Sequence, residues 1–126
     1  MNTRVEYLYR DSGNYKQFAS VVLTGEITPE ERARIAAALD SGEYFIPGQV
    51  GLEDLQPKMP FFPNRESDHV WHELDPNLGI AVVDYPPTMD LDVHEFASRF
   101  TGEWDILAAM KRLGLPPPDL SDLTSF

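Results

Sequence analysis

A chain of 126 residues with 42% hydrophobic and 25% charged side chains has the size and composition of one globular domain. Twenty-one carboxylates against ten lysines and arginines give a formal net charge of −11, which disfavours nucleic acid and anionic membranes and favours a basic protein partner. The alternative is that the acidity only keeps a small cytoplasmic protein soluble. The absence of cysteine excludes disulfides, thiol catalysis and thiolate metal sites, and no apolar run approaches a membrane span, so a cytoplasmic location is expected.

Two strands joined by a turn are predicted at the start of the sequence. Residues 3–9 alternate in the manner of a half-buried strand, with three large apolar side chains on one face. Residues 17–23 are rich in β-branched and aromatic side chains, which also favour a strand. Between them, residues 10–14 read Arg-Asp-Ser-Gly-Asn, a composition typical of turns. The segment as a whole therefore predicts a β-hairpin.

A helix is predicted over residues 28–41. Thr28 is a good N-cap, Pro29 occupies the first helical position, and Glu31 stands where a capping box requires an acid. Gly42 supplies the left-handed residue that commonly ends a helix.

The middle of the chain alternates between short strands and irregular structure. A strand is expected over residues 43–46, and residues 47–65 are expected to be irregular because prolines and glycines interrupt them repeatedly. Residues 68–74 fit either a strand or a short helix. Residues 78–85 predict a strand centred on isoleucine and valine side chains.

Two more helices are predicted before a proline-rich acidic tail over residues 116–126. Asp92 is a suitable N-cap for the first, and residues 103–113 form the second, with basic side chains in its last turn. Hairpins without helical crossovers indicate a single α+β domain over residues 1–115, with a mostly antiparallel sheet and three helices packed largely on one face. Apolar positions that recur at these periods form the expected core: Val5, Val21, Leu39, Phe45, Ile80, Val82, Phe96 and Leu107.

The hairpin loop is the first candidate binding site. It gathers Arg10, Asp11, Asn14, Tyr15 and Lys16 within seven residues. Arginine and lysine supply hydrogen-bond donors and tyrosine supplies a stacking face, and such residues dominate the energetics of many interfaces. The alternative is that Asp11 and Asn14 only shape the turn while Arg10 pairs with a nearby carboxylate.

Histidines beside carboxylates form the second candidate site. Imidazole nitrogens with carboxylate oxygens suit zinc or iron, so His69, His72, Glu73 and His94 are candidate metal ligands. On a helix His69 and His72 share a face, whereas on a strand they point to opposite faces and a joint site fails. The alternative, which we favour, is a strand whose histidines bond to carboxylates or backbone; no metal and no cofactor are then expected.

An apolar run in the irregular segment is the third candidate. The residues Met59-Pro60-Phe61-Phe62-Pro63 lie where little regular structure is expected to bury them. If these side chains remain exposed, they mark a partner site, because contiguous apolar surface is uncommon on soluble monomers. The alternative is that they pack onto the core of the domain.

Two short motifs resemble a family of small bacterial proteins. The first is Tyr7-x-Tyr9-Arg10-Asp11-x-x-Asn14-Tyr15-Lys16, and the second is Asp68-His69-x-Trp71-His72-Glu73. Together they cover less than a fifth of the chain, and the resemblance implies no activity.

These features favour a binding protein over an enzyme. Small size, acidity and the lack of a complete catalytic set predict a cytoplasmic regulatory protein, an immunity- or antitoxin-like interaction module that acts through protein–protein contacts. The expected partner is a protein, and a basic one, rather than nucleic acid or a membrane. The alternative is a small metal-dependent enzyme that uses the His69, His72 and His94 cluster. The oligomeric state is left open.

Overall fold

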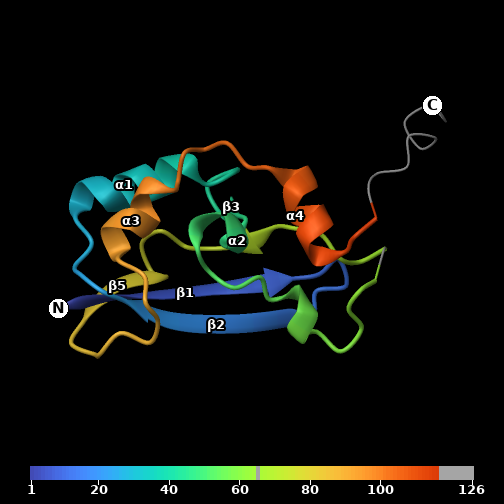
Figure 1. Cartoon of the computed structure of the whole chain (residues 1–126), viewed down its shortest axis with the longest axis horizontal. Helices are drawn as coiled ribbons and strands as arrows, with labels where there is room; N and C mark the ends of the chain where they lie inside the picture. Colours follow the sequence, from blue (N-terminus) through green and yellow to red (C-terminus); the bar gives the residue numbers. More distant parts are fainter. Residues whose placement is uncertain (65, 117–126) are drawn as a thin grey trace.

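The computed structural model describes residues 1–64 and 66–116, so most of the expected tail lies outside the described residues. Within these ranges the chain forms a five-stranded, antiparallel sheet with four α-helices, and the helices lie over one side of it (Figure 1). The α+β class is therefore confirmed, with one helix more than expected. The elements in chain order are β1 (Asn2–Arg10), β2 (Lys16–Leu23), α1 (Pro29–Ala38), β3 (Tyr44–Phe45), α2 (Pro47–Val50), the 3₁₀ helix η1 (Gln56–Lys58), β4 (His72–Glu73), β5 (Ile80–Val83), α3 (Val93–Ser98) and α4 (Ile106–Leu113).

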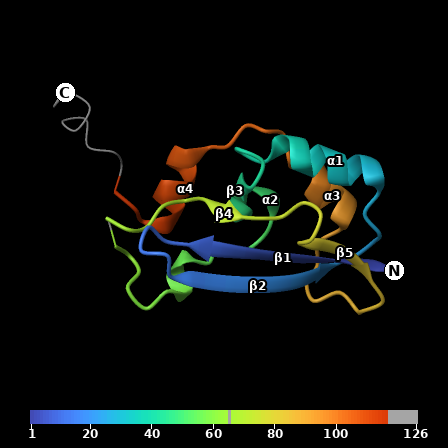
Figure 2. The same cartoon turned by 180° about the vertical axis from the view of Figure 1, so that it is seen from behind.

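Strand β1 is the centre of the sheet. It pairs along its length with β2 on one side, from Thr3 opposite Leu23 to Arg10 opposite Lys16. On its other side it pairs with β5 near its start and with β4 near its end, and β3 pairs with β4. The predicted hairpin is confirmed, and the two views show it running along the base of the molecule (Figures 1 and 2).

The alternation of β1 separates a buried face from an open face. Its odd-numbered side chains, among them Val5, Tyr7 and Tyr9, lie at most 4% exposed beneath the helices. The prediction of a buried core position is wrong for two residues, because Val82 is 38% exposed and Leu107 is 65% exposed. Among the described strands β5 pairs with β1 alone, and α4 turns a different face, that of Ala109, toward the protein interior. The other expected core residues are buried or packed against the core.

Helix α1 begins as predicted but ends at Ala38 instead of residue 41. The capping box at Thr28 is complete. After the helix the chain reverses tightly: Tyr44 donates its N–H to the carbonyl of Asp40, and Ser41 takes a positive φ of 52°. The helix ends early because this turn must deliver β3 to the sheet.

The irregular middle segment contains two short helices that the sequence analysis missed. Pro47 starts α2 at the first helical position, where a proline loses no hydrogen bond, and Gly51 ends it with a φ of 94°. Proline therefore initiates structure here, where it was expected to interrupt it. Within the described residues, no helix is both long and apolar enough to cross a membrane.

The remaining predicted elements are shorter in the structure. Residues 68–74 form a strand only at His72–Glu73, and β5 occupies the middle of the predicted range 78–85. Helix α4 starts at Ile106 because the side chain of Asp105 caps it by accepting the N–H of Ala108. Glu103 therefore lies outside the helix.

Candidate functional site

The tip of the β1–β2 hairpin is fastened to the segment that precedes β4. The hydroxyl of Tyr9 donates to Oδ1 of Asp68 at 2.6 Å. The backbone N–H and the hydroxyl of Ser12 both donate to the carbonyl of Ser67, at 3.0 and 2.9 Å. The two sequence motifs, about sixty residues apart, thus meet in one hydrogen-bonded network. This network holds the loop at a defined position.

His72 is a structural residue that packs against Tyr9, a member of this network. Its ring is fully buried beside Tyr7 and Tyr9. Nε2 accepts the N–H of Leu55 at 2.9 Å, and Nδ1 donates to the carbonyl of Val70 at 3.2 Å, so both nitrogens are used. Burial lowers the pKa of His72 to about 4, which keeps the ring neutral.

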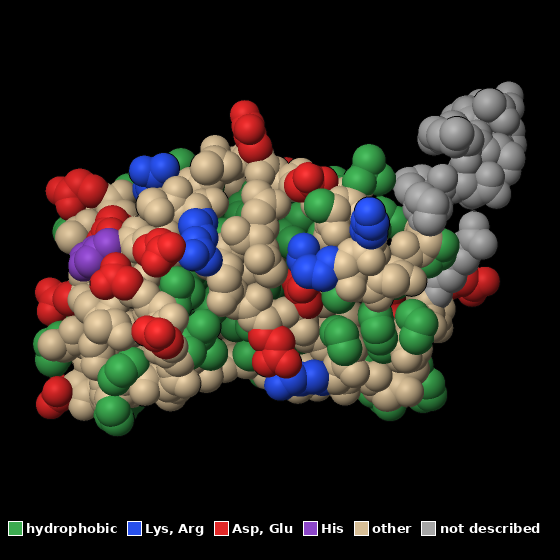
Figure 3. All heavy atoms as spheres, viewed as in Figure 1, with side chains coloured by type: hydrophobic (Ala, Val, Ile, Leu, Met, Phe, Trp, Pro, Cys, Tyr) green, Lys and Arg blue, Asp and Glu red, His purple; other side chains and the backbone are tan. Residues whose placement is uncertain are grey.

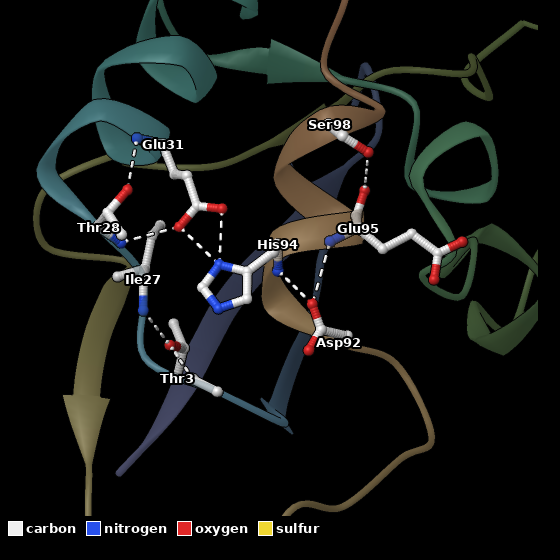
Figure 4. Close-up of polar contacts among 9 residues, drawn as sticks. Thr3, Ile27, Thr28, Glu31, Asp92, His94, Glu95 and Ser98 are labelled. Atoms are coloured by element: carbon white, nitrogen blue, oxygen red, sulfur yellow. Dashed lines mark hydrogen bonds and ion pairs between the residues drawn. The ribbon is translucent and has the colours of Figure 1, made fainter.

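The other two histidines are placed separately. Nε2 of His69 bonds to the carbonyl of Arg10 at 2.7 Å, and its Nδ1 accepts the N–H of Trp71. His94 lies on α3 and bonds to Glu31 of α1 (Figure 4). Among residues 1–64 and 66–116, no group of three histidine, aspartate or glutamate side chains gathers as a metal site. The structure therefore does not bring the candidate ligands together.

Three of the five predicted loop residues shape the turn. Nε of Arg10 lies 2.9 Å from Oε2 of Glu73, and its Nη1 donates to Oδ1 of Asn14 at 2.6 Å. Asn14 takes a φ of 67°, and Oδ1 of Asp11 accepts the N–H of Tyr15 at 2.9 Å. The guanidinium of Arg10 and the two turn residues are thus engaged within the protein, which is the alternative raised by the sequence analysis.

Tyr15 and Lys16 border a pocket of about 120 Å³, which we call the hairpin-end pocket. Its other wall is the segment 59–62, in which Phe61 is 70% exposed, while Tyr15 is 63% exposed. Figure 3 shows hydrophobic side chains gathered on the surface at this end of the molecule, below α4. Asp11, Tyr15 and Lys16 of the first sequence candidate and residues 59–62 of the third therefore border the same pocket.

The apolar run 59–63 is divided between core and surface. Met59 packs against the main core and Phe62 against a second, smaller cluster, so these two side chains anchor the segment. Phe61 between them projects outward. The sequence reveals the run as apolar and aromatic side chains in a segment without regular structure. No local sequence signal connects the run with the hairpin loop.

The size of the hairpin-end pocket limits what it can hold. Its volume of about 120 Å³ is close to the ~150 Å³ of a cavity that holds one benzene ring, and well below the ~300 Å³ at which pockets for small-molecule ligands begin. The pocket is therefore suited to one apolar side chain. Asp11, Asp68 and Lys16 also border it. Comparison of the chain with protein-family models, with curated proteins and with solved structures finds no match.

A separate polar cluster joins α1 to α3 at the far end of the sheet (Figure 4). Glu31 completes the capping box with Thr28 and also accepts from Nδ1 of His94 at 2.8 Å. The hydrogen bond with Glu31 raises the pKa of His94, and the charge of Asp92 adds to this effect. Burial alone would raise the pKa of Glu31, but its hydrogen bonds with Thr28 and His94 lower it overall.

The ion pair of His94 with Glu31 is expected to stabilise the protein most between about pH 4.5 and 6.5. The contribution of His94 is full below its ordinary pKa of 6.5 and is lost as the pH rises through its raised pKa. That of Glu31 is present above its ordinary pKa of 4.5 and is lost as the pH falls through its lowered pKa. The His94 side chain is 53% exposed, so the gain is only about 0.5 kcal/mol.

Urea unfolding of the wild type and of His94→Gln at pH 5.5 and pH 8.5 measures this contribution. The free energy of unfolding of the variant should fall below that of the wild type at pH 5.5 and match it more closely at pH 8.5. An equal difference at both values would show that the charge of His94 contributes nothing.

Proposed function

We propose that the protein is a small cytoplasmic binding protein, a regulatory module of the immunity- or antitoxin-like kind, whose hairpin-end pocket receives an apolar side chain from a basic protein partner. The observation that supports this most is the pair of exposed aromatic rings beside the pocket, Tyr15 at 63% and Phe61 at 70%. Covering a large aromatic side chain contributes roughly 2 kcal/mol, so a partner that covers both rings gains substantial affinity.

The way the loop is held favours binding further. The contacts of Ser12 with Ser67 and of Arg10 with Glu73 are made within the free protein. The backbone that carries Tyr15 is therefore ordered before a partner arrives, and association costs less conformational entropy. This arrangement is typical of a surface that recognises another protein without a large rearrangement.

Charge supports a basic partner. The chain carries −11 formally, and Asp11 and Asp68 border the pocket against Lys16. Complementary charge accelerates encounter and discriminates against acidic competitors.

The metal-dependent alternative has no comparable support, because His69 and His72 use both ring nitrogens in hydrogen bonds within the protein.

Site-specific photocrosslinking tests the proposal. A photoreactive benzoylphenylalanine is placed at position 61 in one variant and at position 78 in a control, because Leu78 is also strongly exposed, at 82%. After irradiation in cells of the source organism, we expect a basic protein to be crosslinked from position 61 and not from position 78. Equal capture from both positions, or none from position 61, would contradict the proposed function.

A further inference from the structure

The sheet has an open edge along the first half of β2. In an antiparallel pair, alternate residues direct both backbone polar groups toward the neighbouring strand or away from it. Glu6 stands opposite Ser20 and donates its N–H to Gly79 on the other side of β1, at 2.8 Å. Ser20 therefore directs its N–H and C=O outward, and so does Phe18, two residues before it. Within the described residues, these outward groups have no hydrogen-bond partner.

The second half of the same edge is already paired by the chain itself. Val22 donates its N–H to the hydroxyl of Thr88 at 2.8 Å and accepts the N–H of Thr88 at 2.9 Å. Thr24 and Asp92 then form a parallel bridge. The chain's own segment from Thr88 to Asp92 thus covers the second half of this edge. Its pairing with β2 ends at Val22, so the half before Val22 stays open.

The open half carries an exposed aromatic side chain and leads to the hairpin-end pocket. Phe18 is 66% exposed on the uncovered face of the sheet, opposite the half-buried Leu8. The first residues of β2, Lys16 and Gln17, line the pocket. Natural proteins usually protect open edges with proline, bulges or charged side chains. Here the centre of the open edge has none of these, which is the arrangement that strand addition requires.

We propose that an extended segment of the partner adds to this open edge, pairs with Phe18 and Ser20, and places one apolar side chain in the hairpin-end pocket. The inference rests on the proposed function and specifies how the partner binds. Five residues from Lys16 to Ser20 span about 13 Å at ~3.3 Å per residue, so a segment of about seven residues covers edge and pocket.

Charge selects this occupant over a second copy of the chain. Two copies would each carry a formal net charge of −11, so they repel each other. A partner segment in which lysine or arginine alternates with apolar residues is instead attracted to the net negative charge of the chain, and at the pocket Asp11 and Asp68 outnumber Lys16.

Peptides selected from a random heptapeptide phage library on the wild-type protein serve as the probe. Ser20→Pro removes one outward N–H and leaves the hydrogen bonds between β1 and β2 in place, whereas the control Ser20→Thr keeps that N–H. We expect Ser20→Pro to weaken peptide binding at least tenfold and Ser20→Thr less than twofold. Bound peptide should slow amide hydrogen exchange at Phe18 and Ser20 at least tenfold.

A second measurement uses the unaltered protein, in case Ser20→Pro does not fold. Methylation of the peptide on the alternate backbone nitrogens that face β2 should abolish binding, and methylation of the other set should not. A peptide that needs Phe61 but tolerates Ser20→Pro and both methylation patterns would overturn this inference and leave the proposed function standing. One that tolerates Phe61→Ala as well would overturn both. Failure to select any binder, or a wild-type dimer that Ser20→Pro separates, would overturn the inference.

Discussion

Replacing His72 by alanine is expected to lower the free energy of unfolding by about 4 kcal/mol, a large fraction of the stability of an ordinary domain. The ring is fully buried, so its removal leaves a cavity. The N–H of Leu55 and the carbonyl of Val70 also lose their buried hydrogen-bond partner. Urea unfolding followed by circular dichroism at pH 7.5 measures the effect.

The exposed histidine provides the control. His94→Ala should cost less than about 1 kcal/mol at the same pH, because the side chain is 53% exposed. Equal losses from the two variants would show that His72 does not have the central packing role assigned to it.

The same residue makes stability depend on pH. His72 binds a proton only near pH 4 in the folded state, whereas its ordinary pKa is 6.5. Between these values the unfolded chain holds more protons, so the free energy of unfolding should fall by about 3 kcal/mol as the pH drops from 6.5 to 4. His72→Gln should lack this part of the decrease, while the titration of carboxylates remains common to both proteins.

Truncation of either exposed ring at the hairpin-end pocket is expected to weaken partner binding about 30-fold or more. Tyr15→Ala and Phe61→Ala each remove an aromatic side chain that the partner would cover, and such residues contribute about 2 kcal/mol or more at the centre of an interface. Isothermal titration calorimetry with the crosslinked partner, once purified, measures the dissociation constants. Thermal melts should stay nearly unchanged, because both rings are exposed in the free protein.

Two further variants test the pocket, and the first of them is the control. Tyr85 is 54% exposed and lies beside the start of β1, where its carbonyl accepts from Asn2, so Tyr85→Ala removes a comparable ring at the opposite end of the strand. Tyr85→Ala should change the affinity less than about twofold. Arg10→Ala removes the ion pair with Glu73 that orders the loop before binding, so it should weaken binding, but less than truncation of either ring does. A loss of affinity in Tyr85→Ala equal to that in Tyr15→Ala would place the interface elsewhere.

The elements that the sequence predicted best are those with complete local signals. Strand alternation in β1 identified the buried face, and the capping box at Thr28 located the start of α1. The ends were less predictable, because they depend on neighbours distant in sequence. Helix α1 ends where the turn around Ser41 must deliver β3 to the sheet, and no local pattern sets that requirement.

The candidate site could be predicted only in parts. The hairpin loop and the run 59–63 were each recognisable, but the contact of Ser12 with Ser67 that brings them together depends on the tertiary fold. The role of His72 could not be predicted locally either. Its Nε2 is occupied by the N–H of Leu55, seventeen positions away, and this contact makes His72 a core residue and not a metal ligand. Residue types thus indicated where chemistry or binding could occur, and tertiary contacts decided which residues remained exposed for it.

Amide hydrogen exchange of the protein with and without its crosslinked partner tests most directly whether the hairpin-end pocket is the binding surface. Protection should appear in the hairpin loop, residues 11–16, and in the facing segment, residues 59–62, which contribute the two walls of the pocket. The opposite end of the sheet, around Asn2 and Tyr85, should exchange at the same rate in both states. Protection confined to that opposite end, with the loop unchanged, would contradict the account.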